Sequence, residues 1–99
     1  MPPRYSRAAD DDLREIYRTS IRLFGVAQAE SYVAMLRNAC ALLGDFPASA
    51  AERRDIDPPV RARSAKSHVI IYEIDGEQRA LILRIRHARE DWTTDPIDG

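Results

Sequence analysis

The sequence predicts an α+β fold, in which an antiparallel helical hairpin packs on one face of a small antiparallel sheet and the elements follow the order β-α-α-β-β-β. Two observations predict it. Apolar residues recur at three- and four-residue steps through the first half of the chain, which is the period of an amphipathic helix. From Val60 onward they alternate, which is the period of a half-buried strand. A chain of 99 residues has room for one domain with one core.

The first half is predicted to contain a short strand at Arg4–Ser6 and then two helices. Residues 10–12 are aspartates in the first turn of the first helix, and Arg18 and Arg22 lie near its end, so both groups complement the helix dipole. Gly25 supplies a stop. The apolar stripe of this helix consists of Leu13, Ile16, Tyr17, Ser20 and Phe24.

A second helix follows at once and ends near Gly44 and Pro47. Because the connection between the helices is so short, they are expected to fold back on each other as an antiparallel hairpin. The segment Gly44–Pro59 shows no period and is predicted to be an irregular crossing. The apolar stripe of the second helix consists of Ala29, Tyr32, Val33, Leu36, Cys40 and Leu43.

Three strands are predicted in the second half, at Val60–Ala65, His68–Asp75 and Arg79–His87, with a tight turn at Asp75-Gly76. Residues 1–92 are expected to form the single domain, and residues 93–99 a flexible C-terminal tail. Alternation in the last strand places Leu81, Leu83, Ile85 and His87 on the core face and Ile82, Arg84 and Arg86 on the other.

Composition excludes several classes of protein. No apolar run is long enough to span a bilayer, and the first residues lack the apolar segment of a secretory signal. The lone cysteine, Cys40, excludes an internal disulfide and fits a reducing compartment, so a cytoplasmic location is predicted. Cys40, His68 and His87 do not show the spacing of zinc ligands, and there is no glycine-rich phosphate loop. Neither a metal nor a cofactor is expected.

Charge is unevenly placed along the chain, although the net charge is only −1. Arg61 and Arg63 share one side of a predicted strand, and Arg84 and Arg86 share one side of another. If both pairs lie on the sheet face away from the helices, they form a basic strip. Such a strip is either a solvated face or a surface for an anionic partner, which would be RNA phosphate or an acidic protein segment.

Two further side chains have both a structural and a functional interpretation. His87, among arginines, has the chemistry of a general acid or base for RNA cleavage. Its place on the core face favours a structural role instead. Trp92 either folds back over the edge of the core or is an exposed anchor for a partner, a role in which tryptophan is over-represented.

An ordered set of short motifs resembles the ParE branch of the ParE/RelE toxin superfamily over roughly residues 4 to 92. Each motif is weak alone, whereas the set is fairly specific, above all the histidine that follows an apolar strand and precedes Arg89 and Asp91. The matching segments are residues 9–16, residues 24–29 with Tyr32, Phe46-Pro47, Val60-Arg61, residues 68–72 and residues 85–91.

This resemblance implies a protein that inhibits growth by binding and poisoning DNA gyrase, rather than an enzyme. It also implies neutralisation by a ParD-like antitoxin with a ribbon-helix-helix domain, in a heterotetramer or larger hetero-oligomer that contacts DNA only through the antitoxin. The candidates for target binding and toxicity are Arg84, Arg86, His87, Arg89, Asp91 and Trp92. The candidates for antitoxin binding are Tyr17, Tyr32, Leu36, Arg61 and Arg63.

The alternative is a RelE-like mRNA endoribonuclease. RNA-cleaving relatives often carry an aromatic hydroxyl near the C-terminus, whereas here no tyrosine follows Tyr72. The nuclease hypothesis therefore depends on a minimal phosphate site, which would be composed of Arg61, Arg63, Arg84 and His87.

Overall fold

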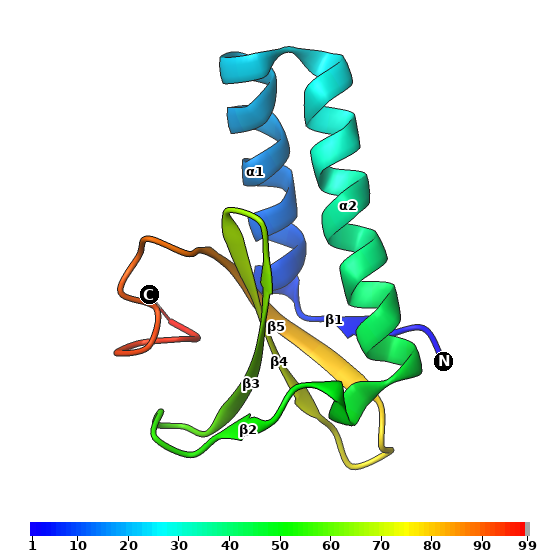
Figure 1. Cartoon of the computed structure of the whole chain (residues 1–99), viewed down its shortest axis with the longest axis vertical. Helices are drawn as coiled ribbons and strands as arrows, with labels where there is room; N and C mark the ends of the chain where they lie inside the picture. The colour runs from blue at the N-terminus through cyan, green and yellow to red at the C-terminus, as the bar shows by residue number, and fades with distance from the viewer. Residues whose placement is uncertain (99) are drawn as a thin grey trace.

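A computed structural model describes residues 1–98 and confirms the α+β fold, with a helical hairpin packed on one face of a sheet (Figure 1). The sheet has five strands in the order β1-β5-β4-β3-β2. The two helices are α1 (Arg7–Phe24) and α2 (Val26–Asp45), followed by a short 3-10 turn, η1 (Pro47–Ser49). The strands are β1 (Arg4–Tyr5), β2 (Glu52–Arg53), β3 (Val60–Ala65), β4 (His68–Ile74) and β5 (Ala80–His87).

The sheet is mixed rather than purely antiparallel. Strands β3, β4 and β5 pair antiparallel, as the sequence predicts. Strand β1 pairs parallel with β5, with Arg4 opposite Leu81. A parallel neighbour needs a long crossover, and the residues between these two strands supply it. Strand β2, which lies in the segment expected to be irregular, pairs antiparallel with β3.

Specific residues begin and end α1, the first helix of the hairpin. At its start, the Ser6 hydroxyl accepts a hydrogen bond from the Ala9 N–H (3.0 Å) and donates one to the Leu83 carbonyl (2.7 Å). At its end, Gly25 has φ of 89°, a conformation that favours glycine, and α2 begins at the next residue. The closed end of the hairpin projects beyond the sheet (Figure 1), and its apolar side chains Leu23, Phe24 and Val26 are exposed there.

Both faces of the sheet carry buried apolar side chains. The main core lies between the helices and the sheet and includes Leu13, Leu36, Cys40, Ile70, Tyr72, Ile82 and Ile85. A second, smaller core lies on the opposite face and consists of Ile56, Val60, Val69 and Ile71, with Ala62, Leu83, Trp92 and Ile97 packed against it. The C-terminal segment, residues 88–98, covers this second core (Figure 1). Within the predicted flexible tail, residues 93–99, Pro96 is fully buried and Ile97 packs on the second core, while Gly99 lies outside the described residues.

A bulge in β5 changes which side chains face the helices. Ile71 lies opposite Arg84, whereas Tyr72 lies opposite Ile82, so Leu83 is an extra residue in β5. Ile82 therefore belongs to the main core and Leu83 to the second, the reverse of the predicted alternation. Beyond the bulge the prediction is correct, since Ile85 faces the helices and Arg84 and Arg86 do not. Strict alternation cannot anticipate an inserted residue.

Within residues 1–98, neither helix is long and apolar enough to cross a membrane. Cys40 is a free cysteine and is fully buried in the main core, and burial raises the pKa of its thiol to about 11. A thiol with so high a pKa is a poor nucleophile near neutral pH, which agrees with a structural role for this residue.

Candidate functional site

The four arginines expected to form a basic strip lie on opposite faces of the sheet. Arg61 and Arg63 are in β3, opposite Tyr72 and Ile70 of β4, and these two partners belong to the main core. Arg61 also donates a hydrogen bond to the Ala50 carbonyl. Two residues of one strand that are two positions apart share a face, so both arginines lie on the helix side.

Arg84 and Arg86 lie on the other face, because their partners in β4 are Ile71 and Val69 of the second core. The single basic strip is therefore not formed. The bulge at Leu83 does not cause this separation. It follows from the register of β3 on β4, which pattern analysis of single strands does not determine.

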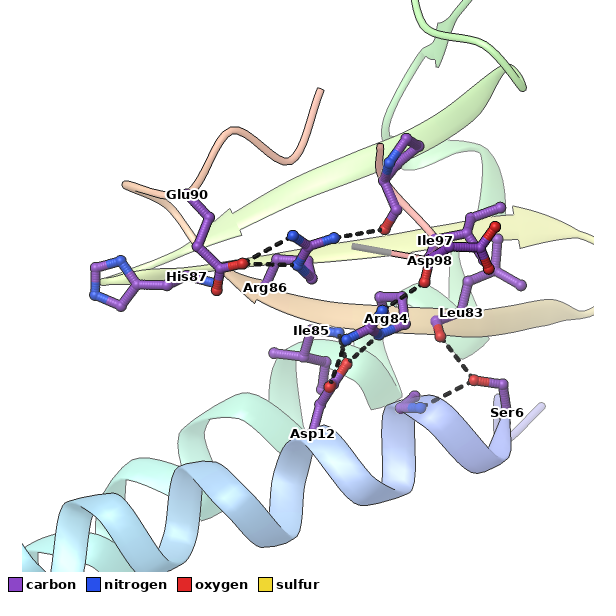
Figure 2. Close-up of polar contacts among 12 residues, drawn as sticks. Ser6, Asp12, Leu83, Arg84, Ile85, Arg86, His87, Glu90, Ile97 and Asp98 are labelled. Atoms are coloured by element: carbon purple, nitrogen blue, oxygen red, sulfur yellow. Dashed lines mark hydrogen bonds and ion pairs between the residues drawn. The ribbon is translucent and has the colours of Figure 1, made fainter. Parts of the chain in front are cut away.

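Arg84 connects α1, β5 and the C-terminal segment (Figure 2). Its Nε and Nη2 donate to the two carboxylate oxygens of Asp12, at 2.7 and 2.9 Å. The same carboxylate accepts the Ile85 backbone N–H at 2.9 Å, and Arg84 Nη1 donates to the Ile97 carbonyl. The side chains of Arg84 and Asp12 are only 14% and 16% exposed, and the hydrogen bond to Asp12 raises the pKa of Arg84. This bidentate pair is a strong, directional contact.

Arg86 is more deeply buried, with 6% of its surface exposed. Its Nε and Nη2 donate to Glu90 Oε2 at 3.0 and 2.8 Å (Figure 2). Its Nη1 donates to the carbonyls of Asp95 (2.8 Å) and Pro96 (3.3 Å). The hydrogen bond from Arg86 lowers the pKa of the Glu90 carboxyl. Both arginines, which the sequence predicts as candidates for target binding, therefore have partners within the chain.

A different set of side chains is presented at the surface of the C-terminal segment. Arg89 and Asp91 are exposed, and Trp92 is half-buried. The Arg53 guanidinium lies 5.8 Å from the centre of the Trp92 ring, which is a cation–π distance. Part of Trp92 therefore packs on the second core, as one of its two predicted roles requires, and the rest of its surface is exposed. We call Arg89, Asp91 and Trp92 the C-terminal surface.

On the helix face, His87 lies beside His68 at one end of the sheet. Their ring centroids are 5.2 Å apart in a T-shaped arrangement, and His68 Nδ1 is hydrogen bonded to the Tyr32 hydroxyl at 2.7 Å. His87 Nδ1 accepts the Arg89 backbone N–H at 3.1 Å. His87 is therefore on the face that the sequence predicts. It is separated from Arg84, so the minimal phosphate site of the nuclease hypothesis is not assembled in this conformation.

These histidines form one wall of a groove of about 450 Å³ beneath the projecting end of the hairpin. The apolar side chains Ile16, Leu23 and Phe24 line it together with Tyr32. The polar residues that complete the lining are Glu15, Thr19, Ser20, Gln28, Ser67, His68 and His87. Tyr32, predicted from the sequence as a candidate for antitoxin binding, lines this groove, whereas Leu23, which also lines it, was not predicted. The available sequence signal for Leu23 was an apolar residue that lies outside the predicted apolar stripe of α1.

The other candidates for antitoxin binding are more widely spread. Leu36 is fully buried in the main core, so a contact with a partner would require α2 to move. Its place on the apolar stripe of α2 already made it a core residue, and the helix packs closely enough to cover it completely. Tyr17 is half-buried on α1, and it does not line the groove. Among residues 1–98, no three metal-binding side chains are grouped to hold an ion.

Stability is expected to depend on the protonation of His68. Burial, and then the neighbouring His87, lower its pKa in the folded protein below the ordinary value. The neutral ring is therefore favoured by folding, and unfolding takes up a proton. The contribution of His68 to the free energy of unfolding should be complete above about pH 6.5, the ordinary pKa of histidine. It should fall as the pH drops from that value toward the lower pKa of His68 in the folded protein.

This expectation is checked by urea unfolding between about pH 7.5 and pH 5.5, in the wild type and in His68→Gln. Glutamine retains hydrogen-bonding groups near Tyr32 but does not titrate in this range. The fall in stability with acid should be smaller in His68→Gln. An identical fall in both proteins would show that other groups are responsible.

A helical hairpin over a sheet, with an open groove of apolar and polar side chains between them, defines a small α+β domain with a surface suited to an amphipathic partner. Residues 4–92 match the model of a family described as the ParE toxin of type II toxin-antitoxin system, parDE. The chain therefore belongs to the ParE toxin family.

Relatives of known name support the same assignment. The chain is 34% identical over 93 residues to Toxin ParE1 of Mycobacterium tuberculosis, an alignment that covers 92% of this chain and 95% of that protein. It is 29% identical over 86 residues to Toxin ParE1 of Caulobacter vibrioides, with 87% and 88% covered. A solved structure described as the chromosomal ParDE TA system from P. aeruginosa superposes with a TM-score of 0.77 at 25% identity, covering 88% of this chain and 95% of the solved chain.

Proposed function

We propose that this ParE toxin inhibits growth by binding DNA gyrase through its C-terminal surface. The observation that carries the proposal is that exposed Arg89 and Asp91 lie close in sequence to Trp92, which packs in part on the second core, on the sheet face opposite the groove. Arginine and tryptophan are the residues most often found at binding hot spots. Gyrase acts in the cytoplasm, which is also the location that we predict for this toxin.

We also propose that a ParD-like antitoxin neutralises the toxin by laying an amphipathic helix in the groove. Phe24 is 61% exposed at the groove and Leu23 63%, and apolar side chains so exposed at a recess are typical of a binding surface. The ParDE system that resembles this chain supports such a partner. With a ribbon-helix-helix antitoxin, which dimerises, the complex would be a heterotetramer or larger and would contact DNA through the antitoxin.

The test of this function separates the two surfaces. Trp92→Ala should raise the toxin concentration needed to inhibit gyrase supercoiling by about 30-fold or more, since a tryptophan anchor contributes about 2 kcal/mol. It should leave antitoxin binding intact. Phe24→Ala should weaken antitoxin binding by about tenfold, because it removes apolar contact area. Wild-type toxin that leaves supercoiling unaffected at every stoichiometry would refute gyrase as the target.

The RelE-like alternative depends on one observation, the contact of His68 with His87 at the open groove. If it is correct, growth arrest is accompanied by fragmented mRNA and is lost in His87→Ala while the fold is retained. Intact mRNA during arrest excludes it. The same culture therefore decides between the two functions.

A further inference from the structure

We infer that Arg84 and Arg86 are positioning residues for target binding: they clamp the backbone of residues 95–97 to the sheet and thereby fix the C-terminal surface in its binding geometry. The inference rests on the proposed function, since that function assigns the C-terminal surface to the target. It gives the two arginines a role different from direct contact. We call Asp12, Arg84, Arg86 and Glu90 the clamp.

The first half of the clamp is oriented from α1. Because Asp12 takes both Nε and Nη2 of Arg84, the guanidinium plane is fixed and its remaining nitrogen, Nη1, is directed at the Ile97 carbonyl. Asp12 is itself held by the Ile85 N–H. Figure 2 shows this carboxylate reaching from the helix to the strand, with the C-terminal segment on the far side of Arg84. A planar guanidinium with its donors in a fixed fork is suited to this arrangement.

The second half has the same design. Arg86 uses Nε and Nη2 on the Glu90 carboxylate and Nη1 on the carbonyls of Asp95 and Pro96. Among residues 1–98, each arginine thus has a carboxylate that orients it and a nitrogen that binds the backbone of the C-terminal segment. Three consecutive carbonyls, from residues 95 to 97, are held in this way. Pro96 is fully buried beneath them, and Ile97 packs on the second core.

The clamp holds two of the three residues of the C-terminal surface, Asp91 and Trp92, from both sides, whereas Arg89 precedes Glu90. Glu90, which Arg86 binds, comes directly before Asp91 and Trp92, and the clamped carbonyls follow after Thr94. Within this interval, the Thr94 hydroxyl donates to Asp91 at 2.8 Å. The loop is therefore fixed at each end and closed within itself. Without the clamp, the side chains of Asp91 and Trp92 would have to be ordered at the moment of binding, which lowers affinity by about fivefold to a hundredfold.

The test uses Arg84→Lys and Arg86→Lys, with Arg54→Lys as the matched control. Lysine keeps the charge but has a single ammonium group, which cannot orient on a carboxylate and bind a carbonyl in the same fork geometry. Arg54 is 86% exposed and its ion pair is with Glu52, away from the clamp. Trp92 is the only tryptophan in the chain, so its fluorescence reports directly whether the segment is docked.

We expect both clamp variants to shift Trp92 emission to the red, to admit a collisional quencher more readily, and to lose about tenfold or more in growth arrest and gyrase inhibition. Antitoxin binding at the groove should be unchanged, and Arg54→Lys should resemble the wild type. Activity that persists after the fluorescence has shifted would overturn the inference. So would activity lost without a fluorescence shift, because the arginines would then act on the target directly.

A second variant covers the case in which a lysine variant fails to fold. Ending the chain at Asp95 removes the carbonyls of Pro96 and Ile97 while both arginines keep their carboxylates. It should shift the Trp92 emission and reduce growth arrest as the lysine variants do, and retained arrest would overturn the inference. If the wild type arrests growth without inhibiting gyrase, the proposed target fails. The inference then still stands if release of the segment abolishes arrest.

Discussion

Replacing Asp12 with alanine is expected to lower the free energy of unfolding by about 3 kcal/mol. The substitution leaves the largely buried Arg84 without its carboxylate and removes the acceptor of the Ile85 N–H. Breaking one partner of a buried ion pair is costly because the remaining charge is desolvated without compensation. Urea unfolding of the purified toxin, followed by far-ultraviolet circular dichroism, measures the change.

The neighbouring residue provides the control for this prediction. Asp11 is exposed and pairs only with Arg14, three residues further along the same helix. Asp11→Ala should change the stability by no more than about 0.5 kcal/mol, since exposed pairs of this kind contribute little. Equal effects at the two positions would mean that Asp12 contributes helix-dipole charge and nothing more, and would remove the basis for the clamp.

Leu36→Ala should also cost about 2–5 kcal/mol, because the side chain is fully buried between α2 and the sheet and its loss leaves a cavity. The spread reflects how far the surrounding side chains can relax into the space. Thermal unfolding at a fixed toxin concentration gives the change in midpoint. Antitoxin affinity, measured under conditions in which the variant is folded, should remain that of the wild type.

Phe24→Ala is the matched substitution for Leu36→Ala. Both remove a large apolar side chain from the hairpin, but Phe24 is 61% exposed at the groove. Its loss should leave stability within about 0.5 kcal/mol and should instead weaken the antitoxin complex. If Leu36→Ala weakened that complex without destabilising the toxin, Leu36 would be a contact residue after all, and the packing of α2 would have to open on binding.

The helices were predicted well from the sequence because residues typical of helix ends mark their boundaries. Ser6 and the aspartates mark the start of α1, and Gly25, at φ of 89°, divides the two helices. Strands β3 to β5 followed from alternation and from the turn at Asp75-Gly76. Strand β2 was missed because two residues in a proline-containing segment carry no period of their own. They become a strand only through pairing with β3.

The candidate site was predicted less well, because its geometry depends on pairing between distant segments. Nothing local places Arg63 and Arg86 on opposite faces, and nothing local brings Asp12 to Arg84. Partners for buried arginines were available in the acidic end of the chain, at Glu90. That end was nevertheless expected to be flexible, since its charge and polarity resemble a solvated tail. The contacts that hold it to the sheet are largely made to backbone carbonyls, and because every residue has a carbonyl, such contacts cannot be predicted from a sequence.

The pairing of the first and last strands has a consequence for biosynthesis. Strand β1 needs Leu81 and Ile82 as its neighbours, the Ser6 hydroxyl needs the Leu83 carbonyl, and Asp12 needs Arg84. A nascent chain that has reached only α2 possesses the hairpin but not the strand on which it packs. Contacts of such long sequence separation form late. We therefore expect the groove and the C-terminal surface to form together, only after β5 has been synthesised.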